Sequence, residues 1–180
     1  MTTLIALLRG INVIGNNKLP MKELSALLMD LGLRDVQTYI QSGNVVFRSN
    51  AKNKTALAAK ITAAIEAQHG FAPHVLLLEA DELHQAMAGN PYPEAAPVPK
   101  TLHLFFLAEV PQHPELKALE AIRIGGERFK LIGKVFYLHT PDGFGPSRLA
   151  GRVEKALGVA ATARNWSTVC KLAEMVGDGK

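Results

Sequence analysis

The chain has 180 residues, of which 48% are hydrophobic and 20% charged, and its formal net charge is +4. This balance excludes an intrinsically disordered chain. The single cysteine, Cys170, excludes an intramolecular disulfide and a zinc site built from cysteines. No apolar run approaches the roughly 18 residues that a membrane helix needs, and Leu4–Leu8 lacks the flanks of a signal peptide. We therefore expect a cytoplasmic protein without a membrane as partner.

The first half of the sequence alternates between strand and helix patterns. Short apolar strands are predicted at 3–8 and 75–78, and an alternating pattern at 36–41 and 45–48 predicts a hairpin around Ser42-Gly43-Asn44. Helices are predicted after Pro20, up to Gly32, and over 53–68. The order strand, helix, strand, strand, helix, strand is typical of a ferredoxin-like, or alpha-beta plait, fold.

The second half repeats this order of elements without repeating the sequence. A short helix over 81–88 and a proline-rich segment up to Pro99 precede a strand at 101–107 and a short helix at 114–121. A hairpin over 128–139, a helix over 147–157, a short strand at 159–163 and a final helix over 165–176 follow. We therefore predict an α+β protein with two tandem ferredoxin-like subdomains (1–80 and 101–180), a linker (81–100) and an extra C-terminal helix.

The predicted topology brings two polar segments together in the first subdomain. In a plait the sheet order is 4-1-3-2, so the end of the first strand meets the start of the third. The Asn- and Gly-rich loop that follows Leu8 should then lie beside the hairpin turn, where amides and backbone N–H groups could bind an anion. The candidate ligand-binding residues here are Arg9, Asn12, Asn16, Lys18, Gln41, Ser42 and Asn44. The alternative is a structural loop whose Gly and Asn residues allow positive φ.

Two further segments carry candidate binding residues in the second half, which holds twelve basic and eight acidic side chains in residues 96–180. Ser147 should cap the helix over 147–157, and Arg148, Arg152 and Lys155 should form one basic face of it. Ser147 and Arg148 are the candidates there. In the last segment Asn165 should cap the final helix, and Arg164, Asn165 and Lys171 are the candidate ligand-binding residues. The structural alternatives are an ordinary capped helix with a solvated basic face, and polar groups that hold the final helix in place.

Taken together, these segments make the chain resemble a bacterial family catalogued as domain of unknown function 1697. The resembling stretches are Arg9-Gly-Ile-Asn-Val, Asn16-Asn-Lys-Leu-Pro-Met21, Thr38-Tyr-Ile-Gln-Ser-Gly-Asn-Val-Val-Phe47, Asn90-Pro-Tyr92, Tyr137, Pro141-Asp-Gly-Phe-Gly-Pro-Ser-Arg-Leu149 and Thr162-Ala-Arg-Asn-Trp-Ser-Thr-Val-Cys-Lys-Leu172. The resemblance implies two alpha-beta plait subdomains and no established activity. Here Ile14 stands where members usually have Gly, Arg148 where Lys is usual, and Ser167 where Asn is usual.

The sequence contains no motif that identifies a catalytic site. Six histidines show no metal-ligand spacing, no G-x-S-x-G elbow is present, and the acidic residues are scattered. We expect no metal and no cofactor, and the sequence leaves open whether the chain is an enzyme and what its oligomeric state is. The favoured function is binding of an anionic ligand, either a phosphate-bearing small molecule or nucleic acid. An enzyme acting on a phosphorylated small molecule and a structural or protein-interaction module are the alternatives.

Overall fold

The structure is a computed structural model, and it describes residues 1–177 of the chain. Two compact units are present, and each is described by itself below. The first contains Met1–His84 together with the chain from Leu172 onward, and the second contains Gln85–Lys171.

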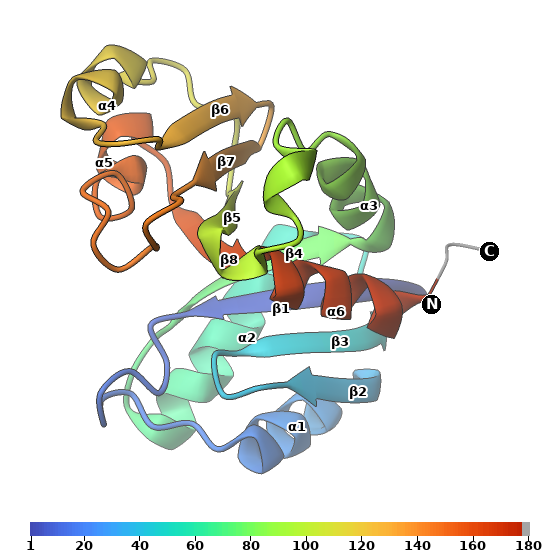
Figure 1. Cartoon of the computed structure of the whole chain (residues 1–180). Coiled ribbons are helices and arrows are strands. Elements are labelled where there is room, and N and C mark those ends of the chain that lie inside the picture. Colours follow the sequence, from blue (N-terminus) through green and yellow to red (C-terminus); the bar gives the residue numbers. More distant parts are fainter. Residues whose placement is uncertain (178–180) are drawn as a thin grey trace. The chain divides into compact units, whose positions relative to one another are not determined.

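The first unit contains a four-stranded antiparallel sheet with the strand order β2-β3-β1-β4 (Figure 1). This order is the one that the sequence predicts for a plait. The elements follow one another along the chain as β1 (Thr2–Arg9), α1 (Met21–Asp30), β2 (Arg34–Tyr39), β3 (Asn44–Ser49), α2 (Lys54–His69) and β4 (His74–Glu79).

Alternation along β1 builds the core of the first unit. Leu4, Ala6 and Leu8 belong to a hydrophobic cluster that includes residues of α1 and α2. Ile5 and Leu7 point to the opposite face of the sheet and are also fully buried. A strand that is apolar on both faces therefore lies at the centre of its sheet, as its nearly continuous apolar run predicts.

The segment between the two sheets is more ordered than a linker pattern suggests. It consists of α3 (Ala80–Ala88), followed by two short 3-10 helices, η1 (Pro93–Ala95) and η2 (Pro99–Thr101). Each 3-10 helix begins at a proline, whose fixed φ favours the first position of a helical turn. Tyr92 and Ala95, which belong to the second unit, are buried.

The second unit contains a second four-stranded antiparallel sheet, with the strand order β6-β7-β5-β8. The remaining elements of the chain are β5 (Leu102–Leu107), α4 (Leu116–Ile122), β6 (Arg128–Ile132), β7 (Val135–His139), α5 (Val153–Leu157), β8 (Ala161–Asn165) and α6 (Trp166–Val176). Both sheets therefore have the strand order of a plait, which confirms the predicted fold class.

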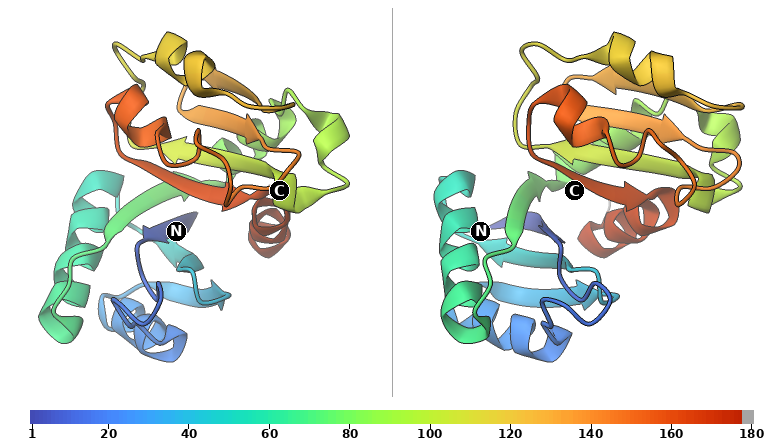
Figure 2. Two further views of the ribbon diagram at one scale, coloured as in Figure 1. Left: turned by 60° about the vertical axis from the view of Figure 1, so that its left-hand side comes forward. Right: turned by 90° about the vertical axis from the view of Figure 1, so that its left-hand side faces the viewer.

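Helices α4 and α5 lie on the same face of the second sheet (Figure 2). Phe105, Phe136 and Leu138 point towards them and share a hydrophobic cluster with Leu119 of α4 and Val153 of α5. The ring of Phe105 meets that of Phe136 edge-on, with the ring centroids 5.8 Å apart. Phe144, from the loop before α5, packs against the same cluster.

The helix predicted over 147–157 is wrong in its first half, because α5 contains only Val153–Leu157. Ser147 to Arg152 form turns instead, with the N–H of Arg152 donating to the carbonyl of Leu149 at 2.8 Å. Gly151 lies within this stretch and lowers its helix propensity. Arg148 therefore does not share a helix face with Arg152 and Lys155, as the sequence predicts.

Candidate functional site

The loop between β1 and α1 is a small hydrogen-bonded hairpin, which we call the β1–α1 loop (residues 10–19). The N–H groups of Val13 and Asn16 donate to each other's carbonyl oxygens at 3.2 and 2.9 Å. Ile14 and Gly15 form the turn with φ values of 46° and 77°. This left-handed backbone suits Gly, whereas Ile rarely adopts it.

Asparagine side chains hold the β1–α1 loop in this shape. Nδ2 of Asn12 donates to the carbonyl oxygens of Leu19 at 3.0 Å and of Gln41 at 2.8 Å, and its Oδ1 accepts from the N–H of Leu19 at 2.8 Å. Nδ2 of Asn17 donates to the carbonyl oxygen of Gly10 at 2.8 Å. These amides therefore have a structural task, which is the alternative that the sequence left open.

The bond from Asn12 to Gln41 places the β1–α1 loop beside the β2–β3 turn (residues 40–43), as the predicted topology requires. At the start of β3, directly after that turn, Nδ2 of the fully buried Asn44 donates to the carbonyl oxygen of Tyr39 at 3.1 Å and to Oγ of Ser42 at 3.0 Å. Gly43 is also buried, at φ 82°. The amide of Asn44 thus closes its own hairpin, and a ligand contact of Asn44 or Ser42 stays a prediction.

The charged candidates of this region lie on the surface. Arg9, Asn16 and Lys18 are exposed. Arg9 lies opposite His74 in the β1–β4 ladder, and burial together with the Arg9 charge lowers the pKa of His74. The structure therefore brings the predicted first-subdomain residues into one region, where the amides of Asn12 and Asn44 bond to groups of the loops themselves. Binding of an anion there stays a prediction.

A groove in the second unit contains the other basic candidates. It lies between α4 and the segment 147–156 and has a volume of about 790 Å³. We call it the α4–α5 groove, and it is lined by Glu115, Ala118, Leu119, Ile122, Ser147, Arg148, Gly151, Arg152, Lys155 and Ala156. Although the predicted helix is incomplete, the turns at 147–152 still bring Arg148 to the same groove as Arg152 and Lys155.

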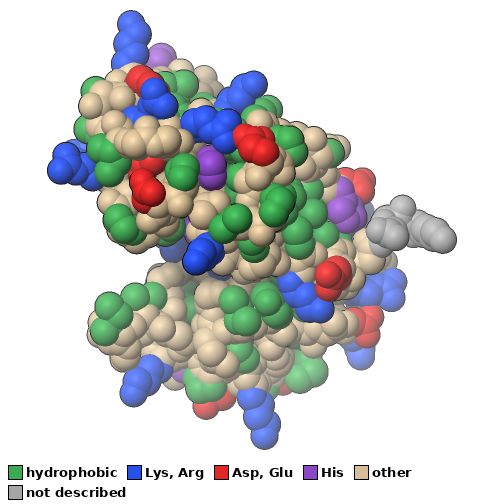
Figure 3. Space-filling model, in the orientation of Figure 1, with side chains coloured by type: hydrophobic (Ala, Val, Ile, Leu, Met, Phe, Trp, Pro, Cys, Tyr) green, Lys and Arg blue, Asp and Glu red, His purple; other side chains and the backbone are tan. Residues whose placement is uncertain are grey.

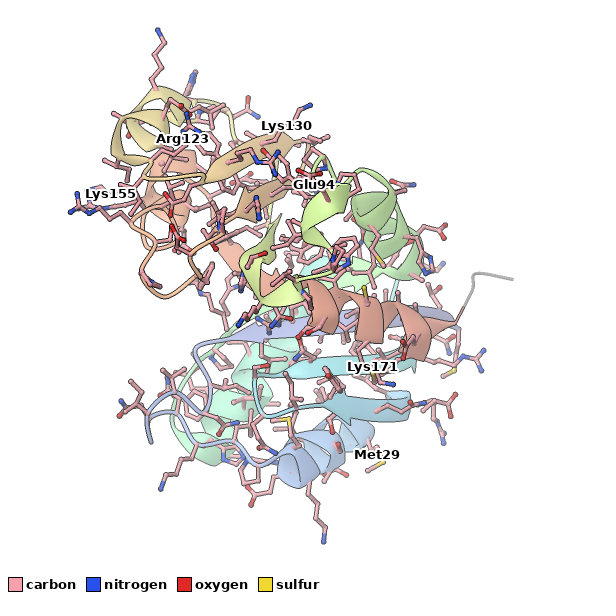
Figure 4. All side chains as sticks on the ribbon, viewed as in Figure 1. Met29, Glu94, Arg123, Lys130, Lys155 and Lys171 are labelled. Carbon is pink, nitrogen blue, oxygen red and sulfur yellow. The ribbon has the colours of Figure 1, made fainter. Side chains whose placement is uncertain are left out.

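The charges in the α4–α5 groove are mostly positive. Arg148, Arg152 and Lys155 are exposed, and Lys155 extends outward from α5 (Figure 4). Among the residues that the structure describes, none of these three lies within ion-pair distance of a carboxylate. Glu115 supplies one negative charge to the lining. The opposite wall is apolar, with Ala118, Leu119 and Ile122 from α4.

Ser147 begins the turn that carries Arg148. Its Oγ accepts a hydrogen bond from the N–H of Ala150 at 3.4 Å. This long bond has the i to i+3 geometry of a cap, although the segment that follows is a turn rather than a helix. The hydroxyl hydrogen of Ser147 is not committed by this bond, since an accepting hydroxyl can still donate.

The third group of candidates lies at the start of α6. Oδ1 of Asn165 accepts a hydrogen bond from the N–H of Thr168 at 2.9 Å, which confirms the predicted cap of the final helix. The side chain of Trp166 is half-buried rather than fully buried. Arg164 is 9% exposed and donates to the carbonyl oxygen of Ala163 at 2.8 Å. Burial lowers the pKa of Arg164 to about 10, so it stays charged at neutral pH. Lys171 is exposed on the same helix, and none of these residues lines the α4–α5 groove.

Sequence reasoning missed a cluster of charged and aromatic side chains on the other face of the second sheet. The guanidinium carbon of Arg128 lies 4.5 Å from the centre of the Tyr92 ring, and Arg128 also forms an ion pair with Glu94 (Figure 4 labels Glu94). Nδ1 of His139 lies 3.1 Å from the guanidinium. One sequence pattern could have revealed this cluster. Arg128 and Lys130 alternate with apolar residues in β6, and residues two apart in a strand lie on the same face of the sheet.

The described residues contain no group of three or more His, Cys, Asp or Glu side chains that could hold a metal ion. Within residues 1–177, no helix is both long and apolar enough to cross a membrane. The candidate residues themselves carry cationic, amide and hydroxyl groups, which are groups that can hydrogen-bond to an anion.

Comparison with known proteins gives the family and the fold. The model of a family described as a protein of unknown function, DUF1697, matches residues 1–137. A solved structure, described as a conserved bacterial protein from Streptococcus pneumoniae, has a TM-score of 0.72 and 23% sequence identity, and the similarity covers 98% of this chain and 99% of that one. No match was found among the curated proteins. The stretches Pro141–Leu149 and Thr162–Leu172 lie beyond the matched residues.

Proposed function

We propose that this chain, which belongs to the DUF1697 family of proteins of unknown function, binds a small anionic molecule in the α4–α5 groove. The observation that carries the proposal is that three cations, Arg148, Arg152 and Lys155, line one groove without an ion-pair partner among the described residues. Three like charges repel one another, and an anion in the groove relieves that repulsion. Arg side chains also offer paired N–H donors that match the oxygens of a phosphate group.

The size and the walls of the groove favour a small molecule over nucleic acid. Its volume of about 790 Å³ falls within the usual range of ligand sites. The apolar wall formed by Ala118, Leu119 and Ile122 suits the uncharged part of a phosphate-bearing molecule. Single-stranded nucleic acid is usually held by aromatic side chains on which bases stack, and the groove lining contains none.

Calorimetric titration tests the proposal with inorganic pyrophosphate, a sugar phosphate and a nucleoside monophosphate as probes. We expect at least one of them to bind, and Arg152→Gln to weaken that binding about tenfold, because a charge-assisted hydrogen bond is lost. Arg34→Gln is the matched control, since Arg34 is an exposed arginine of β2 in the other unit and its replacement changes the net charge equally.

Two results would overturn the proposal. One is that none of the three probes binds at low salt. The other is that Arg152→Gln and Arg34→Gln weaken binding by the same factor, which would indicate a general effect of net charge. A probe that binds and is then converted, as followed by phosphorus NMR, would make the binding protein an enzyme, with the same groove as its site.

A further inference from the structure

The β1–α1 loop presents apolar side chains to solvent. Ile14 is 95% exposed and Val13 is 51% exposed. Ile40, in the neighbouring β2–β3 turn, is 49% exposed. Figure 3 shows hydrophobic side chains on this end of the first unit, together with Lys or Arg side chains. An exposed apolar side chain is ordinary when it stands alone, but here three belong to two connections that the Asn12–Gln41 hydrogen bond ties together.

The backbone makes the two isoleucines unusual. Ile14 and Ile40 have φ values of 46° and 49°, in the left-handed region that β-branched residues rarely adopt. At Asn12 and Asn17, which also have positive φ, asparagine is a suitable residue. Ile14 and Ile40 therefore combine a backbone conformation that is unfavourable for isoleucine with an apolar side chain exposed to water. Neither feature stabilises the fold, which points to contact with another molecule.

The electrostatics of the two connections are one-sided. Residues 9–22 contain Arg9, Lys18 and Lys22 and no acidic residue, and residues 36–47 contain no charged residue. Lys18 and Lys22 are exposed. The apolar tip is therefore flanked by positive charge, which favours an anionic partner.

We propose that the β1–α1 loop is a contact site for an anionic lipid surface, into which Val13 and Ile14 insert while Lys18 and Lys22 meet the headgroups. Two observations favour lipid over an apolar socket on a protein. The exposed side chains are aliphatic, whereas hot spots of protein interfaces are enriched in Trp, Tyr and Arg. The loop also pairs part of its backbone internally, since the N–H groups of Asn12, Val13 and Asn16 all donate to carbonyls of the loop.

This site departs from the expectation, drawn from the sequence, that a membrane is not a partner. That expectation rests on the absence of a long apolar segment, and surface contact does not need one. An apolar tip flanked by lysines is a two-part membrane signal, in which burial of side chains adds to attraction by anionic lipid. The site lies wholly in the first unit and does not depend on ligand binding in the α4–α5 groove.

Flotation with lipid vesicles tests the inference on the full chain. Vesicles of phosphatidylglycerol and phosphatidylcholine in equal parts should bind the protein, and vesicles of phosphatidylcholine alone should bind it far less. Ile14→Asn should lower the partition coefficient about tenfold, because the inserted side chain is lost. Asparagine tolerates a left-handed backbone, so this variant keeps the loop conformation. Ile124→Asn, at an exposed isoleucine of the second unit, is the matched control and should bind as the wild type does.

Two further measurements make the outcome decisive. Lys18→Gln with Lys22→Gln should weaken binding several-fold at low salt and reduce its dependence on salt, since cation–headgroup attraction is screened. Thermal unfolding of each variant should show that it is folded. The inference is overturned if the wild type does not float with the anionic vesicles, or if Ile14→Asn floats as well as the wild type does. The second result would mean adsorption through other basic surfaces.

Discussion

Nδ2 of Asn12 donates to the carbonyl oxygen of Gln41 at 2.8 Å, across 29 residues of sequence. The same side chain bonds the N–H and the carbonyl oxygen of Leu19. One amide therefore fixes both ends of the β1–α1 loop and joins it to the β2–β3 turn. A backbone peptide group could not do this, because its N–H and its C=O point in opposite directions. A side-chain amide carries its two donors and its acceptor on one terminal group.

Asn12→Gly should lower the free energy of unfolding by about 1–3 kcal/mol, because three hydrogen bonds are lost and partly buried backbone groups lose their partners. Glycine is the sharpest replacement, since it accepts the φ of 53° at this position and so isolates the loss of the side chain. Urea-induced unfolding measures the effect. Asn16→Ala, at an exposed neighbour, is the control and should change the free energy by less than about 0.5 kcal/mol. Equal effects of the two changes would contradict the structural role of Asn12.

Gly43→Ala should destabilise the first unit strongly. A Cβ atom at Gly43 would lie 2.6 Å from Cβ of Leu8 and 2.9 Å from Cδ1 of Ile11, and the φ of 82° adds backbone strain. We expect a loss of about 3 kcal/mol or more in the free energy of unfolding, because Leu8 and Ile11 are both buried and cannot move aside cheaply.

The matched control for this change is Gly10→Ala. Gly10 has a φ of 78°, but a Cβ atom there would meet nothing within 4 Å. Its cost should be only the backbone term of about 1–2 kcal/mol. Denaturant unfolding of both variants separates the two contributions, and a Gly43→Ala variant no less stable than Gly10→Ala would show that the close packing is not limiting.

The sequence predicts the fold well where a local signal and the overall topology agree. Gly43 lies between two alternating runs, and the turn, the hairpin and the order of the first sheet follow from that pattern. The predicted meeting of the β1–α1 loop with the β2–β3 turn is confirmed by the Asn12–Gln41 hydrogen bond. Even so, the pattern does not reveal that the asparagines face backbone groups rather than a ligand.

The α4–α5 groove could be predicted only in part. The basic residues Arg148, Arg152 and Lys155 are visible in the sequence, but the predicted helix fails at Gly151, where local propensity is weak. The apolar wall from Ala118 to Ile122 is separated from these residues by about thirty positions and a whole hairpin. Such a wall depends on tertiary packing, for which the sequence pattern carries no signal.

His103 should make the second unit sensitive to acid. Its ring stacks on Phe144 with the centroids 3.8 Å apart, and burial lowers the pKa of His103 to about 4. Because the pKa in the folded state is below the value of 6.5 in the unfolded state, the unfolded state binds the proton first as the pH falls. The contribution of the neutral His103 to the free energy of unfolding is therefore fully present above pH 6.5. It is lost as the pH falls towards 4, by about 3 kcal/mol in total.

Urea unfolding at a series of pH values measures this decline. His103→Leu should remove the part of the slope that arises between pH 6.5 and 4, whatever its effect on stability at neutral pH. Phe144→Ala should reduce the slope by a smaller amount, because it exposes the ring of His103 to water and raises its pKa. A slope that neither change affects would contradict the assignment to His103.

Tyr137→Phe should weaken the attachment of α3 to the second sheet. The hydroxyl of Tyr137 donates to the carbonyl oxygen of Ala86 at 2.6 Å, and Tyr137 is only 1% exposed. Burial raises the pKa of Tyr137 to about 12, so the hydroxyl keeps its proton as a donor throughout the usual pH range. Loss of this donor leaves a buried carbonyl without its partner and should lower the free energy of unfolding by about 1–2 kcal/mol.

Tyr39→Phe is the matched control for this change, because Tyr39 is half-buried and its carbonyl, rather than its hydroxyl, bonds Asn44. It should change the stability by less than about 0.5 kcal/mol. Hydrogen exchange localises the effect further. In Tyr137→Phe the amide of Gly89, which donates to the carbonyl oxygen of Gln85 at 2.9 Å, should exchange faster, since the last turn of α3 loses its tie to β7. Unchanged exchange at Gly89 would mean that other contacts hold this turn in place.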